Sequence, residues 1–171
     1  AFNTLEKLAG DDDLVVLVGL LVDEKQDKAR EAAEDAIVAV SMRIEDRDRR
    51  ADAVLAAAGK ANGAVKASLV RVLGRVQGPG PLAAIRQAAK DADAVVVDAA
   101  VRGLAKWENA DVLDDLLAIA LDEGKEQPHR VLALRGYVRL LRLPSDRPAI
   151  QTLQMLQSAM GLAQQDEDRK L

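Results

Sequence analysis

The sequence contains no cysteine and a single histidine, His129. The lack of cysteine excludes disulfide bonds, a thiolate nucleophile and cysteine-ligated zinc within these 171 residues. The helical zinc motif that uses two histidines is excluded as well, because the chain has only one. With this inventory the sequence offers no metal site of the usual kind, and we predict no metal and no cofactor.

Aromatic residues and long apolar runs are also scarce. The aromatic residues are Phe2, Trp107 and Tyr137, which argues against β-sandwiches and barrels, because their strands are rich in aromatic and β-branched side chains. The longest apolar run, from Leu14 to Val22, has nine residues, whereas a membrane-spanning helix needs about 20. No signal peptide is visible at the start of the sequence, and the cellular compartment stays open.

Alanine, in contrast, occupies 31 of the 171 positions, and 49% of the residues are hydrophobic. Alanine is the best helix former, so this composition predicts closely packed helices and excludes a disordered chain. The 24 basic and 28 acidic residues give a net charge of −4, which argues against bulk affinity for nucleic acid. The length predicts one domain or one part of a longer array.

Turn signals divide the sequence into short segments whose apolar residues recur at helical spacing. Between these breaks we expect one set of helices near 14–22, 50–59, 82–89 and 112–121. A second set of segments begins at Arg30, Lys66, Asp98 and Arg130, at spacings of 36, 32 and 32 residues. The third, sixth, seventh and tenth positions after each start form one mostly apolar stripe. The sequence therefore predicts a helical hairpin repeated at least four times.

These periods predict one helical-repeat domain over residues 1–171. We expect repeats at 10–43, 45–77, 80–108 and 110–143, preceded by the tail of another repeat at 1–9 and followed by an incomplete repeat at 146–171. Because both ends are out of register, we interpret the chain as part of a longer array or multidomain protein. The alternative is a naturally short protein.

The segments 99–107 and 129–137, which read AAVRGLAKW and HRVLALRGY, resemble second helices of the HEAT-repeat family, including its short bacterial type. Members of that family open the second helix with a basic residue; Asp98 departs from this pattern. The resemblance implies an all-α fold, a right-handed α-α superhelix of about four to five antiparallel helix pairs. It also implies that the second helices line a concave surface.

Candidate catalytic groups are few. No nucleophile lies beside a general base in the predicted elements, so we predict no catalytic residue and a non-enzymatic protein. Carboxylates cluster at 11–13, 114–115 and 122–123. We expect these carboxylates to cap helices or to lie on solvated helix faces. The alternatives are a pair of catalytic acids and a set of calcium ligands. We expect His129 to be an exposed or capping residue at a helix start, and 78–81 to be a turn.

The fifth and ninth positions of each second helix point away from the predicted core, because successive residues are rotated by about 100°. On the implied concave surface these positions and their flanks would form a basic face with Trp107 as an aromatic anchor. The candidate partner-binding residues are Arg71, Arg75, Arg102, Lys106, Trp107, Arg135, Arg139 and Arg142. The alternatives are ordinary solvated arginines and a Trp107 partly buried between repeats.

This pattern predicts a scaffold for protein–protein or interdomain contacts, whose basic face accepts an acidic segment of a partner or of a neighbouring domain. Two alternatives stay open. The same face could bind nucleic acid through phosphate contacts, although the net charge and the few aromatic residues argue against it. The chain could also be a non-catalytic accessory domain of a larger bacterial enzyme.

Overall fold

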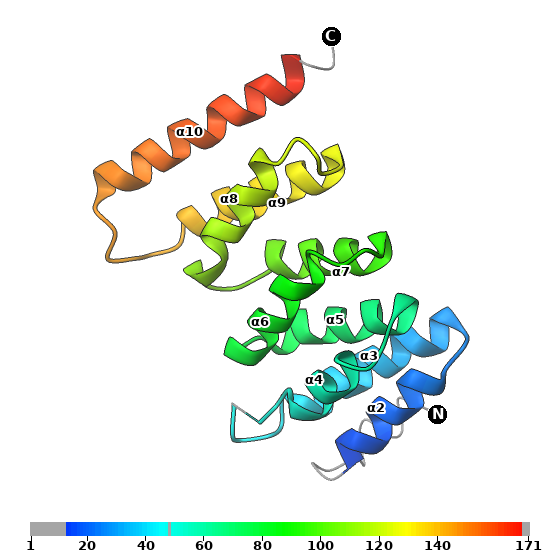
Figure 1. Cartoon of the computed structure of the whole chain (residues 1–171). Coiled ribbons are helices and arrows are strands. Elements are labelled where there is room, and N and C mark those ends of the chain that lie inside the picture. The colour runs from blue at the N-terminus through cyan, green and yellow to red at the C-terminus, as the bar shows by residue number, and fades with distance from the viewer. Residues whose placement is uncertain (1–12, 48, 169–171) are drawn as a thin grey trace. The chain divides into compact units, whose positions relative to one another are not determined.

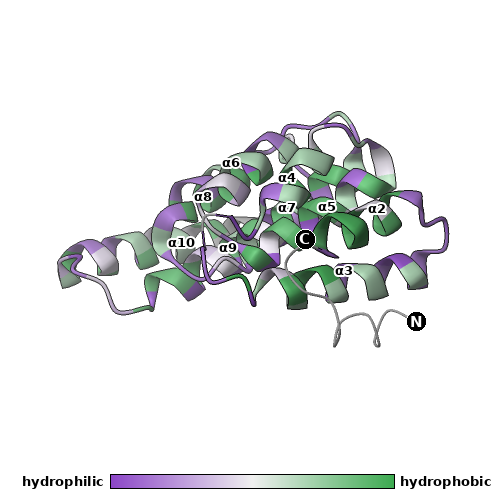
Figure 2. Ribbon diagram, turned by 90° about the horizontal axis from the view of Figure 1, so that it is seen from below, coloured by the Kyte–Doolittle hydropathy of each residue, from purple (hydrophilic) through white to green (hydrophobic). Residues whose placement is uncertain are grey.

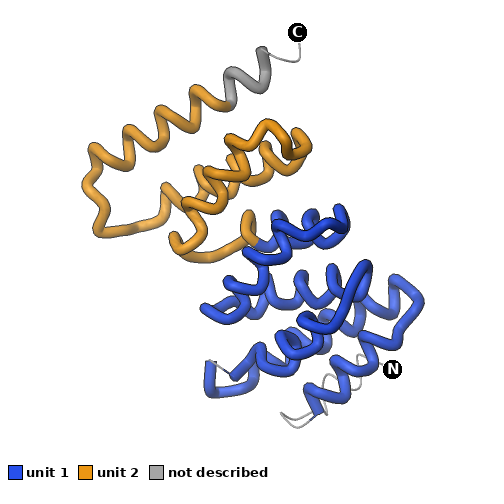
Figure 3. Tube along the Cα trace, viewed as in Figure 1, with its two compact units in different colours: residues 1–103 blue, residues 104–171 orange. Residues whose placement is uncertain are grey.

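The computed structural model describes residues 13–47 and 49–168, apart from the side chains of residues 163–168. Within these residues the fold is all-α, as predicted, and no strand is present. The helices fall into two compact units, residues 1–103 and 104–171 (Figure 3). The predicted second-helix tail at 1–9 lies outside the described residues.

Unit 1 is built from successive helical hairpins in two layers (Figure 1). Its helices are α2 (Leu14–Asp23), α3 (Asp27–Ser41), α4 (Asp52–Ala58), α5 (Gly63–Val76), α6 (Pro79–Ala88) and most of α7 (Ala94–Ala105). The first helices α2, α4 and α6 contact one another in order, and the second helices α3 and α5 contact each other. Within each pair, α2 packs on α3 and α4 packs on α5.

Unit 2 continues the alternation of helices. It contains the short 3₁₀ helix η2 (Ala110–Val112), α8 (Leu113–Leu121), α9 (Gln127–Leu141) and α10 (Ala149–Asp168). Helix α9 packs between α8 and α10, since it contacts both. Hydrophobic and hydrophilic residues are interspersed along α9, whereas α2 is hydrophobic over nearly its whole length (Figure 2).

The predicted apolar stripe of the second helices forms their buried face. At the third, sixth and seventh positions after each predicted start every residue is buried, from Ala33 in α3 to Tyr137 in α9. At the tenth position Glu108 is exposed, because α7 has already ended at Ala105. Burial raises the pKa of the Tyr137 phenol, as expected for a hydroxyl withdrawn from water.

Helix starts explain two differences from the sequence prediction. Residues 78–81 were expected to form a turn, but α6 already begins at Pro79, because proline lacks a backbone N–H that the first helical turn leaves unpaired anyway. The chain reverses at Gln77 and Gly78, which have φ angles of 59° and 117°. His129 was expected to be exposed or to cap a helix, and the exposed placement is wrong, because the side chain is buried in the first turn of α9.

The basic residue at the start of two second helices has a structural role. Arg30 donates to the carbonyl oxygen of Glu24 (2.8 Å), just past the end of α2. Arg130 donates from Nε to the carbonyl oxygen of Ala120 (3.2 Å), near the end of α8. The last carbonyls of a helix lack partners within the helix and attract cations. This position therefore joins the second helix of a hairpin to the end of the first.

Candidate interaction surface

Trp107 corrects the predicted surface. The residue is 1% exposed, so it is a core side chain and cannot be the exposed anchor expected from the sequence. The expectation failed because it extended the helical rotation of α7 as far as residue 107, whereas α7 ends at Ala105. The Trp107 backbone N–H instead donates to the carbonyl oxygen of Leu104 (3.0 Å) in a turn beyond the helix.

In unit 1, the predicted cations of α5 are paired with carboxylates of α3. Arg71 donates twice to Glu34, at 2.7 Å from Nη2 and 3.1 Å from Nε to the same Oε1, and also contacts the Ser68 hydroxyl. Arg75 pairs with Asp35 at 2.6 Å. Each guanidinium on this face therefore has an acidic neighbour one helix away.

Arg102 is neutralised within its own helix. It donates from Nε to the carboxylate of Asp98, one turn earlier in α7, at 2.8 Å. This hydrogen bond raises the pKa of the Arg102 guanidinium, which stays charged but has a carboxylate beside it. The three predicted cations of unit 1 thus carry little uncompensated charge.

In unit 2, the predicted cations are differently placed. Lys106, Arg135 and Arg142 are exposed, and no carboxylate among the described side chains forms an ion pair with them. Arg139 donates from Nη2 to the carbonyl oxygens of Ala105 (3.1 Å) and Trp107. Its charge therefore also holds the turn after α7 against α9.

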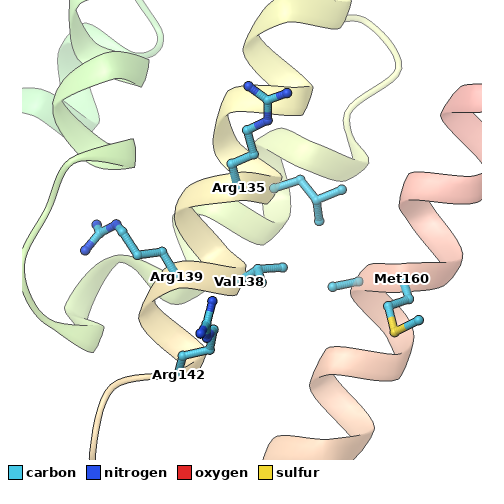
Figure 4. A pocket seen from close by; sticks show the side chains of 7 residues that line it. Arg135, Val138, Arg139, Arg142 and Met160 are labelled. Atoms are coloured by element: carbon cyan, nitrogen blue, oxygen red, sulfur yellow. The ribbon is translucent and has the colours of Figure 1, made fainter.

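Arg135, Arg139 and Arg142 lie along a groove between α9 and α10 with a volume of about 590 Å³. Its apolar lining consists of Leu134 and Val138 from α9 and Ala159 and Met160 from α10. Figure 4 shows Val138 on the side of α9 that faces α10, and Met160 on α10 across the space between the two helices. Arg139 extends from α9 on the side away from α10 (Figure 4).

The surface predicted from the sequence included neither the acidic partners nor the apolar lining of the groove. Asp35 occupies the fifth position of its second helix, which is one of the positions assigned to the basic face. Its negative charge was therefore a signal in the sequence that some arginines of this face would be neutralised. Val138 occupies the eighth position after Arg130, beside the fifth and ninth positions. The sequence predicted a further repeat at 146–171, but it did not predict that the helix of this repeat leaves a groove beside Val138.

A second apolar groove lies in unit 1, between α2 and α4, with a volume of about 430 Å³. Its lining is mostly valine and alanine, with Lys60 at the rim. Among the described residues, no group of three or more acidic or histidine side chains is arranged to hold a metal ion. Neither groove brings together a nucleophile and a general base.

A family model for HEAT repeats matches residues 51–135, from the residue before α4 to the middle of α9. This chain belongs to the HEAT-repeat family. Comparisons with curated proteins and with solved structures gave no match. The family assignment agrees with the helical hairpins of unit 1 and with the resemblance seen in the sequence.

HEAT repeats are generally scaffolds for protein interactions, and the family is typically non-enzymatic. In the part of this HEAT-repeat chain that the structure describes, no helix combines the length and the apolar character that crossing a bilayer requires. Membership of this family therefore favours a role in contacts with other proteins.

Proposed function

We propose that this HEAT-repeat chain is a non-enzymatic scaffold that binds an acidic segment of another protein or domain through the cationic surface of α9. This surface consists of Arg135, Arg139 and Arg142, with Lys106 as a further exposed cation of unit 2. The observation that carries the proposal is that Arg135 and Arg142 lack a carboxylate partner among the described side chains. Arg71, Arg75 and Arg102 contribute less, because Glu34, Asp35 and Asp98 already neutralise them.

Charge complementarity supports an acidic partner in particular. A guanidinium binds a carboxylate through two parallel N–H donors, and such pairs are stronger than neutral hydrogen bonds. Cations that already have an internal partner must lose it before they bind another carboxylate, whereas Arg135 and Arg142 have none to lose. The partner-binding residues are therefore proposed to lie on α9 rather than along all the second helices.

The test is a fluorescence anisotropy titration with a labelled glutamate-rich peptide of about 15 residues in about 50 mM and about 300 mM salt. We expect saturable binding at low salt that weakens as the salt is raised, since exposed charges are screened. The double variant Arg135→Glu/Arg142→Glu should bind at least about tenfold more weakly, a loss of about 1.4 kcal/mol.

The matched control is Arg43→Glu/Lys90→Glu, which reverses two exposed charges of unit 1 and so reaches the same net charge. It should bind within about twofold of the unchanged protein if local pairing at α9 decides affinity. Equal losses in both double variants would mean that only the total charge matters, and the proposed surface would be wrong. A labelled DNA duplex that bound better than the peptide, and lost binding on Arg135→Glu/Arg142→Glu, would assign the surface to nucleic acid instead.

A further inference from the structure

The sequence contains a single asparagine–glycine pair, Asn62–Gly63, and the structure places it at the start of α5. Asn62 is exposed and is the residue immediately before the helix, which begins at Gly63. Its side chain makes no hydrogen bond that caps α5, and it has no other partner among the residues that the structure describes. The side-chain amide of Asn62 is therefore in water and free to react.

The chemistry open to such a pair is an attack within the main chain. The backbone nitrogen of Gly63, after losing its proton to hydroxide, attacks Cγ of Asn62, and the side-chain amide leaves as ammonia. Water then opens the resulting five-membered succinimide ring at either of its two carbonyls. One opening gives aspartate, and the other gives isoaspartate, in which the main chain runs through the former side chain. A Cβ atom on the following residue hinders the attack, whereas glycine does not.

The backbone conformation favours glycine at position 63. Gly63 has a φ angle of 53°, in the left-handed region that side chains with a Cβ atom rarely adopt. Its backbone N–H belongs to the first turn of α5, where N–H groups have no acceptor within the helix. No other described group accepts a hydrogen bond from it. The nitrogen that must attack is thus unpaired, and the residue that carries it is unhindered.

Asn109 provides a comparison within the same chain. It is also exposed and also precedes a helix, η2, and its φ and ψ angles of −125° and 176° are close to the −138° and 172° of Asn62. Its side-chain oxygen, however, accepts the backbone N–H of Asp111 at 3.0 Å, and the next residue is Ala110. The two asparagines therefore differ in the freedom of the amide and in the following residue, and not in backbone angles.

We propose that Asn62–Gly63 is a site of spontaneous deamidation, at which the folded chain converts Asn62 to aspartate and isoaspartate much faster than it converts Asn109. The reaction needs water and hydroxide and no enzyme. It replaces a neutral amide by a carboxylate at the start of α5.

The position of the site connects the modification to the contact between α5 and α7. The carbonyl oxygen of Asn62 accepts the backbone N–H of Lys66 at 3.2 Å, and the Lys66 ammonium pairs with Asp91 in the turn before α7 at 2.6 Å. In isoaspartate this carbonyl becomes a free carboxylate and the main chain gains a methylene, so the hydrogen bond to Lys66 is lost. Aspartate keeps the main chain and is as favourable as asparagine before a helix. Isoaspartate is therefore the destabilising product.

The test measures the deamidation of both asparagines in the folded full chain by mass spectrometry of tryptic peptides. The chain is incubated in warm, mildly alkaline buffer, and trypsin then releases residues 61–66 by cleaving after Lys60 and Lys66. A sample digested without incubation corrects for deamidation during digestion. Asn62 should react at least about tenfold faster than Asn109, whose hydrogen bond must first be broken and whose neighbour carries a Cβ atom. The rate at Asn62 should rise with the hydroxide concentration.

The variant Asn62→Ser removes the reacting amide and keeps a residue that is favoured before a helix. Its matched control is Asn109→Ser. After incubation, the unchanged chain and Asn109→Ser should both show a lower Tm than before, whereas Asn62→Ser should keep its Tm. Asn62→Asp, which reproduces the other product, should have a Tm close to that of the fresh unchanged chain.

Three results would overturn the proposal. Equal rates at Asn62 and Asn109 would show that the free amide and the glycine have no effect. Reaction of Asn62 only in urea would show that the folded start of α5 protects the pair. A fall in Tm on incubation that is the same in Asn62→Ser as in the unchanged chain would show that the loss of stability arises elsewhere.

Discussion

Trp107 is the largest of the fully buried side chains among the described residues, and it lies just beyond the end of α7. Its backbone carbonyl and that of Ala105 accept hydrogen bonds from Arg139, while Gly136 of α9 lies against the backbone of Ala105. One turn therefore carries an aromatic core residue, a guanidinium contact and a close helix approach. The turn at residues 105–107 thus connects the end of α7 to α9 within unit 2, and the buried Trp107 side chain is unavailable to a partner.

Trp107 is the single tryptophan of the chain, so fluorescence tests this burial directly. We expect native emission that is blue-shifted relative to the urea-unfolded chain, and acrylamide quenching that is slower in the native state, because the indole is shielded from water. Native emission that coincides with that of the unfolded chain would show an exposed side chain. Trp107→Ala should destabilise the fold by about 3–5 kcal/mol, measured by urea unfolding.

At the scale of helices, polar contacts join neighbouring hairpins in addition to the apolar core. Lys66 near the start of α5 donates to Asp91, in the turn between α6 and α7, at 2.6 Å. The same carboxylate accepts the backbone N–H of Asp93 (2.9 Å), and Asp93 in turn accepts from Val95 in the first turn of α7. The start of α5 and the start of α7 are thereby linked through one charged side chain.

The hydrogen bond from Lys66 lowers the pKa of Asp91, and a backbone hydrogen bond from Asp93 acts in the same direction. Because the pKa is lower in the folded state, the stabilisation is fully present above the unfolded value of about 3.9 and is lost as pH falls through the folded value. Asp91→Asn should therefore lower Tm at pH 7, and the difference from the unchanged protein should disappear on acidification.

The asparagine at position 91 keeps an oxygen for the Asp93 N–H, so this comparison isolates the charge. In the Asp91→Asn background, Lys66→Gln should have little further effect on Tm at pH 7, because its partner charge is already absent. A Tm difference between Asp91→Asn and the unchanged protein that stayed constant from pH 7 down to about pH 3 would contradict the assignment.

At the scale of the molecule, the chain forms two compact units, and both strong chromophores, Trp107 and Tyr137, lie in the second. Two glycines mark close helix approaches within the units. In unit 1 a Cβ atom on Gly74 would lie 3.0 Å from the backbone of Gly103, and in unit 2 a Cβ atom on Gly136 would lie 3.0 Å from the backbone of Ala105. Each contact involves backbone, which cannot rotate away as a side chain can.

Both Gly74→Ala and Gly136→Ala should destabilise, because overpacking of about 1–3 kcal/mol exceeds the gain in helix propensity of about 1 kcal/mol. In urea unfolding followed by Trp107 fluorescence, we expect Gly136→Ala to lower the midpoint more than Gly74→Ala does. Circular dichroism, which reports all helices, should detect both, since repeat units carry part of their stability within themselves.

The control for these variants is Gly19→Ala in α2, where an added Cβ has nothing within 4 Å. It should stabilise the chain by about 1 kcal/mol through helix propensity alone. If Gly74→Ala and Gly136→Ala shift the fluorescence and dichroism midpoints equally, the chain unfolds as one cooperative unit. If Gly74→Ala stabilises as Gly19→Ala does, the close approach of α5 and α7 would be refuted.

The sequence by itself determined the helical class, the alternation of first and second helices and the buried stripe of the second helices. Those features depend on the helical spacing of apolar residues, which is a local property of the sequence. Residues such as Leu73 and Tyr137 are buried because of their positions within their own helices. The HEAT-repeat family was recognisable for the same reason, since its signature is a repeated local pattern.

Only the tertiary structure decided which of the seven cations among the predicted partner-binding residues are already paired with a carboxylate. Arg71 and Glu34 are 37 residues apart, and Arg75 and Asp35 are 40 apart, so their pairing depends on how α5 packs on α3. Trp107 is buried because α7 ends two residues before it, and the groove beside Val138 exists because α10 packs on α9. Helical spacing describes a single helix, whereas charge neutralisation, helix ends and grooves depend on the neighbouring helices.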